Sequence, residues 1–218
     1  MGWKTNLIIV NVGVLDEGKL LTALGYGGAI PQAECTCEAM FPPKSLVIGQ
    51  YAGCTLIGEP KLPTKILDHP DGEEARRLLN QFPGNTVLIC TLHSVVNLAG
   101  FCLYEKGVLK RCFAVSSDDG VFANTGSPLP EEDRFLSRFV KSIDSGGRDL
   151  YQATDGESFT VDQLGEDIVF EVIARMLGGR PDEGDTLFNA HARAYKRRSF
   201  LSSLLAGCGN TQRAQLRC

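Results

Sequence analysis

The chain has 218 residues, of which 43% are hydrophobic and 22% are charged, as is typical of a soluble globular protein. A formal net charge of −4 argues against a general nucleic-acid-binding protein, and no window approaches the roughly 20 apolar residues of a membrane span. Length and composition therefore predict one domain, or one domain with an appendage.

Eight cysteines are present, and three of them, Cys90, Cys102 and Cys112, lie inside apolar runs that are typical of buried strands. Residues 1–10 contain only a short apolar run and no cleavage signal of a secreted protein. Free thiols in the reducing cytoplasm are the interpretation that fits both observations.

The first predicted element is a buried strand over residues 7–12, followed by a short helix from about Asp16 to Leu24. Glycines at 25, 27 and 28 come after this helix, so they favour a helix cap and turn over a dinucleotide-binding loop. The pattern of residues 33–41 is compatible with either a strand or a helix. Within them Cys35 and Cys37 could form half of a metal site, but no second pair stands at ligand spacing.

Further along, the sequence predicts strands over 45–50 and 54–58, a connection or short strand over 62–68, and a surface helix over 73–82. The central stretch from Asn85 to Pro130 then predicts a strand over 86–92 and a hairpin of 98–105 with 108–115 around Lys106-Gly107. A turn at 116–120 and a short strand over 121–123 complete a meander.

The last third predicts a helix over 130–143, a polar connector over 145–156, and a long helix that begins after Thr160 and ends near Leu177. Residues 200–205 are expected to form a short amphipathic helix. No acidic residue follows Asp185, whereas six basic residues do. The basic tail over 193–217 could contact an anionic partner, or it is only a solvated, partly disordered end. We therefore divide the chain into a domain over 1–185 and a basic appendage over 186–218.

Together these elements predict one α/β domain on the boundary with α+β, in which helices flank a mixed sheet of about six to eight strands with an antiparallel meander. The strands over 7–12 and 86–92 are expected at the centre of the sheet, because both are continuous apolar runs that suit burial on two faces.

The candidate chemistry gathers around His93, at the end of a predicted strand, and around Asp118 and Asp119 in the following turn. A histidine with two carboxylates can hold a divalent metal or act as an acid–base pair. Alternatively, the two aspartates only form the turn. Candidate binding residues in the same stretch are Asn97, Ser116 and Asn124.

Several phrases in order along the chain resemble those of an uncharacterised bacterial family, a domain of unknown function. They are Met1-Gly2-x-Lys4-Thr5, Tyr51-Ala52-Gly53-Cys54, His93-Ser94-Val95-Val96, and Ser116-x-Asp118-x-Gly120 followed by Asn124-x-Gly126-x-Pro128-Leu129. The resemblance implies a shared fold unit and no particular activity.

Two classes of function remain open. The first, slightly preferred, is a non-catalytic intracellular binding or interaction protein, since the sequence holds no complete catalytic constellation, cofactor fingerprint or metal quartet. The second is a metal-assisted or acid–base hydrolase-like enzyme that uses His93, Asp118 and Asp119. No motif implies a cofactor.

Overall fold

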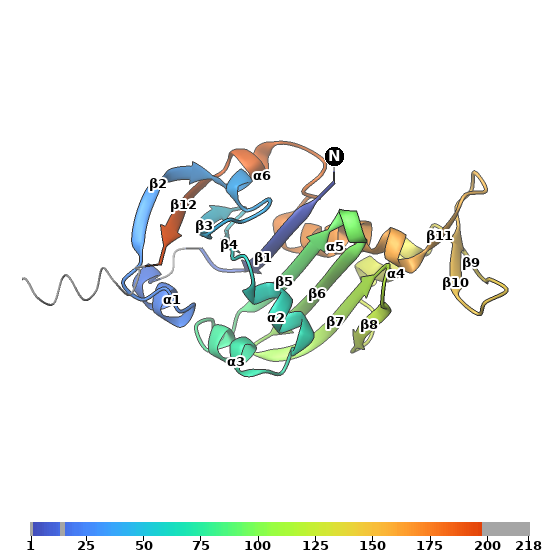
Figure 1. Ribbon diagram of the computed structural model, residues 1–218, viewed down its shortest axis with the longest axis horizontal. Coiled ribbons are helices and arrows are strands. Elements are labelled where there is room, and N and C mark those ends of the chain that lie inside the picture. Colours follow the sequence, from blue (N-terminus) through green and yellow to red (C-terminus); the bar gives the residue numbers. More distant parts are fainter. Residues whose placement is uncertain (1, 14–15, 198–218) are drawn as a thin grey trace, which may run out of the picture.

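The computed structural model describes residues 2–13 and 16–197, and its main feature is a nine-stranded antiparallel sheet (Figure 1). The strands lie across the sheet in the order β2 (Ile30–Thr36), β12 (His191–Lys196), β3 (Leu46–Tyr51), β4 (Cys54–Gly58), β1 (Lys4–Val10), β5 (Thr86–His93), β6 (Leu98–Glu105), β7 (Val108–Ser116) and β8 (Gly120–Thr125). The predicted fold class is confirmed, but the sheet of the described residues is antiparallel and not mixed, and it has nine strands where six to eight were expected. Because every pairing is antiparallel, the protein falls on the α+β side of the predicted boundary.

The two predicted central strands, β1 and β5, do lie side by side in the middle of the sheet. The predicted hairpin is also confirmed, as β6 and β7 are joined by Lys106 and Gly107 with φ of 52° and 78°. Two consecutive left-handed residues form the turn whose twist matches that of antiparallel strands.

Helices cover both faces of the sheet and create two hydrophobic cores (Figure 1). One face packs against α1 (Glu17–Ala23), α2 (Leu62–Asp68) and α3 (Glu73–Leu79). The other face packs against α4 (Pro130–Leu136) and the long α5 (Val161–Leu177), which ends at Gly178 with φ of 78° as predicted. The alternation of side chains along each strand therefore decides which core each residue enters.

The expectation of a connection or strand over 62–68 is wrong, since these residues form α2. Leu62, Pro63, Ile66 and Leu67 are all buried, which is the spacing of one helix face. The helix begins where the Glu59 carboxylate accepts hydrogen bonds from the backbone amides of residues 61 and 62, at 2.7 and 2.5 Å. Glu59 thus satisfies the free amides at the start of α2. This start signal lies before the helix and not within residues 62–68.

The predicted helix over 130–143 is too long, because α4 ends at Leu136 and residues 140–143 form strand β9 (Val140–Ile143). β9 pairs with β10 (Asp149–Gln152), which in turn pairs with β11 (Ser158–Thr160), in a small sheet that projects from the body of the molecule (Figure 1). The Asp144 carboxylate closes the β9–β10 turn by accepting hydrogen bonds from the amides of Gly146 and Arg148.

The described chain ends in β12, which lies between β2 and β3 in the interior of the sheet. It follows α6 (Thr186–Asn189), and both fall inside the segment expected to be an appendage. The chain therefore belongs to the sheet up to Lys196. The helix predicted over 200–205 lies outside the described residues. No helix in the described ranges is long and apolar enough to cross a membrane.

Candidate functional site

The predicted site residues take part in separate local structures. His93 ends β5, and its Nδ1 atom is buried with no hydrogen-bond partner among the described residues. The preceding Leu92 belongs to the core under α5, so strand alternation directs His93 to the opposite face of the sheet. No group of three His, Cys, Asp or Glu side chains that could hold a metal occurs in the described part of the chain.

The aspartates lie in the β7–β8 turn. The Ser116 hydroxyl accepts a hydrogen bond from the Asp119 amide at 3.0 Å and lies 3.2 Å from the Asp119 carboxylate. This is the local pattern in which a serine side chain stabilises a turn. Asp118 is exposed. The hydrogen bonds between Ser116 and Asp119 therefore give both residues a structural role in the turn.

The two asparagines lie in different networks. The Asn97 side chain donates a hydrogen bond to Asp162 of α5 at 3.2 Å, and its own backbone is left-handed with φ of 44°. The Asn124 side chain accepts a hydrogen bond from Arg111 at 2.6 Å. Within the described ranges, Ser116 with Asp119 is the one hydrogen-bonded pair among the six predicted residues.

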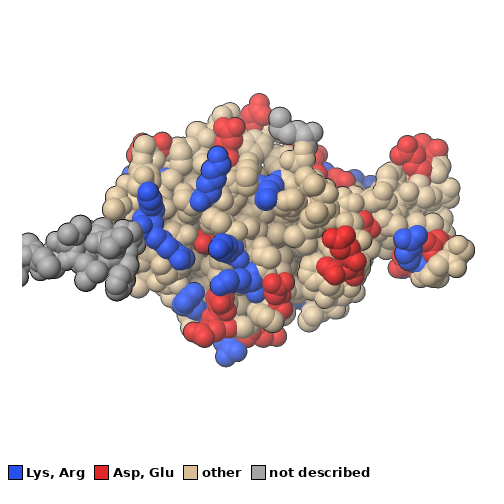
Figure 2. Space-filling view, in the orientation of Figure 1, with Lys and Arg blue, Asp and Glu red and all other residues tan. Residues whose placement is uncertain are grey.

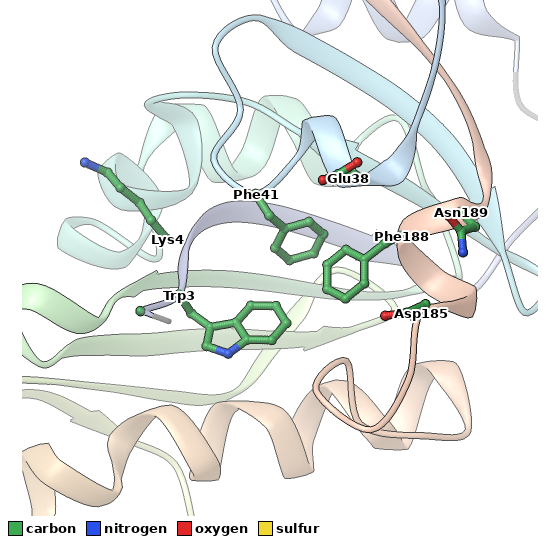
Figure 3. Close-up of a pocket in the computed structure, with 8 residues that line it drawn as sticks. Trp3, Lys4, Glu38, Phe41, Asp185, Phe188 and Asn189 are labelled. Atoms are coloured by element: carbon green, nitrogen blue, oxygen red, sulfur yellow. The ribbon is translucent and has the colours of Figure 1, made fainter.

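A site that the sequence did not reveal lies at the N-terminal end of β1. Trp3, Phe41 and Phe188 line a cavity of about 470 Å³, which we call the aromatic pocket (Figure 3). The ring centroids of Trp3 and Phe188 are 5.6 Å apart, those of Phe41 and Phe188 are 5.1 Å apart, and those of Trp3 and Phe41 are 5.7 Å apart. Three segments far apart in sequence thus bring their rings together.

The topology explains this convergence. Phe41 follows the short 3₁₀ helix η1 (Cys37–Ala39), and Phe188 lies in α6 directly before β12. Because β12 pairs with β2, the ends of these two segments meet, and the amide of Cys37 donates a hydrogen bond to the carbonyl of Ala190 at 2.8 Å. The insertion of β12 into the sheet therefore assembles two of the three walls.

The third wall, Trp3, is fixed by its backbone. Its amide donates a hydrogen bond to the Ser94 hydroxyl at 2.7 Å, and its carbonyl accepts one from the Ser94 amide at 2.9 Å. The same hydroxyl bonds to the Glu166 carboxylate of α5. Ser94 thus ties the strand end that carries Trp3 to the end of β5 and to α5. On its inner side the Trp3 ring also packs edge-on against Phe170, at 4.9 Å.

The polar lining of the aromatic pocket consists of Glu38, Asp185, Lys4 and Asn189. Figure 3 shows Glu38 and Asp185 on the side of the rings where Phe188 lies, whereas the Lys4 side chain extends away on the other side. In the described ranges neither carboxylate forms an ion pair. Two acids against one amine leave a formal charge of −1 on the lining.

Cys37 lies buried behind the pocket in η1, and it belongs to the Cys35/Cys37 pair considered as half of a metal site. Burial, with a smaller effect from Cys35, raises the pKa of the Cys37 thiol to about 11. Cys37 thus packs as a buried thiol of the hydrophobic core.

An antiparallel α+β domain with an aromatic pocket beside β1 is the class of protein that fold and site define. A family model described as a family of unknown function (DUF6928) matches residues 30–190, well over half of the chain, so the protein belongs to that family. The matched range contains Phe41 and Phe188 but not Trp3. No curated protein and no solved structure matches the chain.

Proposed function

We propose that the protein is a non-catalytic binding protein whose site is the aromatic pocket. The observation that carries this proposal is the convergence of Trp3, Phe41 and Phe188 on one cavity of about 470 Å³. Cavities of this size, lined by aromatic rings with a few polar groups, are the usual form of a small-molecule site.

The energetics agree with this interpretation. The three rings are half-buried, so each keeps apolar surface open to the cavity. A ligand that covers such a ring removes this surface from water, which stabilises the complex by roughly 25 cal/mol per Å². The surrounding elements are held by β12 pairing and by Ser94, so little ordering free energy opposes binding.

The sequence offers a built-in reporter, because Trp3 is its single tryptophan. We expect the neutral dye N-phenyl-1-naphthylamine to bind once per chain and to accept excitation energy from Trp3. Phe188→Ala should weaken binding roughly tenfold or more, because it removes one wall, and burying an aromatic side chain is worth about 1.5–3 kcal/mol. A fluorescence titration at 295 nm excitation measures both quantities.

The matched control is Phe122→Ala, which removes an exposed phenylalanine of β8, 42% exposed, that is not part of the pocket. It should leave dye affinity unchanged. Thermal melts of both variants separate loss of binding from loss of folding. Equal affinities in the wild type and a folded Phe188→Ala protein would contradict the proposal, as would the absence of dye binding.

A second candidate is the metal-assisted or acid–base hydrolase-like enzyme built on His93, Asp118 and Asp119. It is supported by the buried Nδ1 atom of His93, which has no partner in the described part of the chain. An orphaned imidazole nitrogen is a group that calls for a functional explanation.

Metal titration discriminates between the two candidates. We expect Mg²⁺, Mn²⁺, Ca²⁺ and Zn²⁺ to leave the melting temperature of the protein unchanged, because Asp119 is already engaged by Ser116. A ligand that binds only the folded state raises that temperature. A rise of several degrees that disappears in the double variant Asp118→Ala/Asp119→Ala would favour the enzyme.

We further propose that the protein works in the cytoplasm and that the tail over 193–217 contacts an anionic partner. Free thiols at all six described cysteines support the location. On the face that Figure 2 shows, most Lys and Arg side chains lie in the half of the molecule where the described chain ends. Arg193 is already paired with Glu34 at 3.3 Å, so the free charge of the tail begins after it, and residues 198–217 lie outside the described ranges.

A further inference from the structure

We propose that the ligand of the aromatic pocket is a small organic cation, with an alkylated ammonium group held against the rings. This inference rests on the proposed function, since it names the chemical class that the same pocket takes. Two independent features of the pocket carry it: the relative orientation of the rings and the charge of the polar lining.

The rings form a corner rather than a stack. The planes of Trp3 and Phe41 meet at 83° and those of Phe41 and Phe188 at 74°, while Trp3 and Phe188 are tilted by only 34°. The three rings contact one another, and each side chain is only partly buried, so each keeps aromatic surface open to the cavity that it lines. The face of an aromatic ring is electron-rich and attracts a cation within about 6 Å of its centroid, most strongly at tryptophan.

The charge of the lining points the same way. Glu38 and Asp185 both line the cavity, and neither forms an ion pair within residues 2–13 and 16–197. Some acids of the fold are paired, as Glu171 is with three arginines. Lys4 extends away from the side on which the two carboxylates lie (Figure 3). An anion would be repelled by the two exposed carboxylates of the lining, whereas a cation would be attracted.

The same features select the kind of cation. A divalent metal ion requires six or more oxygen ligands, or a tetrahedral set of nitrogen and sulfur, and two carboxylates with aromatic walls supply neither. An alkylated ammonium spreads its charge over methyl groups, so it loses little hydration when rings replace water around it. The cavity of about 470 Å³ holds such a group together with a short chain.

The test compares choline with its neutral isostere 3,3-dimethylbutan-1-ol, in which a carbon replaces the charged nitrogen. Each compound is titrated against the full chain, by Trp3 fluorescence and by displacement of N-phenyl-1-naphthylamine. We expect choline to bind at least about tenfold more tightly than the isostere. The double variant Glu38→Gln/Asp185→Asn should weaken choline binding and leave the affinity of the isostere unchanged.

Glu157→Gln serves as the matched control, because Glu157 is an exposed acid in the turn between β10 and β11 and does not line the pocket. It should change neither affinity. Equal binding of choline and the isostere would overturn the inference and keep the pocket as an apolar site, as would dye binding that choline does not displace. Failure of the dye itself to bind would overturn the proposed function, so the two failures are distinguishable.

Discussion

Replacing Glu132 with leucine is expected to destabilise the protein by about 3–5 kcal/mol, among the largest effects of any single substitution. Glu132 of α4 forms an ion pair with Arg111 of β7 at 2.8 Å, and the two side chains are only 4% and 3% exposed. Removing one partner leaves an uncompensated charge in the interior, which costs much more than the pair itself contributes. Urea unfolding followed by circular dichroism measures the difference.

The surroundings of the pair strengthen this expectation. The Glu132 carboxylate also accepts a hydrogen bond from the amide of Leu129 at 2.8 Å, so it caps its own helix. Arg111 donates to the Asn124 side chain and to the carbonyl of Gly126. Loss of Glu132 therefore leaves an arginine with only neutral acceptors. Asn124, one of the predicted binding residues, has a structural role in this network.

The double variant Arg111→Met/Glu132→Leu is the control. It removes both charges and keeps the volume, so it should recover at least about 2 kcal/mol relative to Glu132→Leu, as expected when a buried pair is replaced by apolar residues. If Glu132→Leu alone lies within 1 kcal/mol of the wild type, the charge is not buried in solution as it is in this structure.

Gly126→Ala is the second substitution with a large expected effect, about 4 kcal/mol, near the upper end of what single substitutions cost. Gly126 has a φ of 83°, and a Cβ atom at this position would lie 2.1 Å from the carbonyl oxygen of Lys110. Since the clash involves backbone, no rotamer change relieves it, and β7 and β8 have to separate.

Gly107→Ala isolates the contribution of backbone conformation. Gly107 has almost the same φ, 78°, but a Cβ there would meet nothing within 4 Å. It should cost only about 1–2 kcal/mol, the penalty of a left-handed residue with a side chain. Chemical unfolding of the two variants side by side makes the measurement. Similar losses in both would show that the close approach to Lys110 is absent in solution.

Local signals account for the part of the fold that the sequence predicts well. The β6–β7 hairpin is encoded by the two residues of its turn, and α5 by Thr160 before it and Gly178 after it. The prediction of a helix over 130–143 fails at its end, where residues with helical spacing form a strand instead. Val140 and Ile143 fit an apolar helix stripe, yet they are 69% and 68% exposed on β9. Helical spacing alone could not reveal that no core lies beside them.

The aromatic pocket could not be predicted because nothing local marks it. Trp3, Phe41 and Phe188 belong to segments about 40 and 150 residues apart, and each on its own is an ordinary apolar residue. They meet only because β12 enters the sheet beside β2, and the basic charge of the tail had suggested an appendage in that region. Knowledge of strand order was the missing information, and strand order is a property of the whole chain.

The position of β12 also determines when the sheet can be completed during translation. Among the described residues, β2 pairs with β12 and with no other strand of the main sheet, so its partner is available only once residue 196 has left the ribosome. Phe188 emerges just before that point, long after Trp3. A nascent chain therefore carries an unpaired strand and an incomplete aromatic pocket for most of its translation, and the pocket is assembled together with the completed sheet.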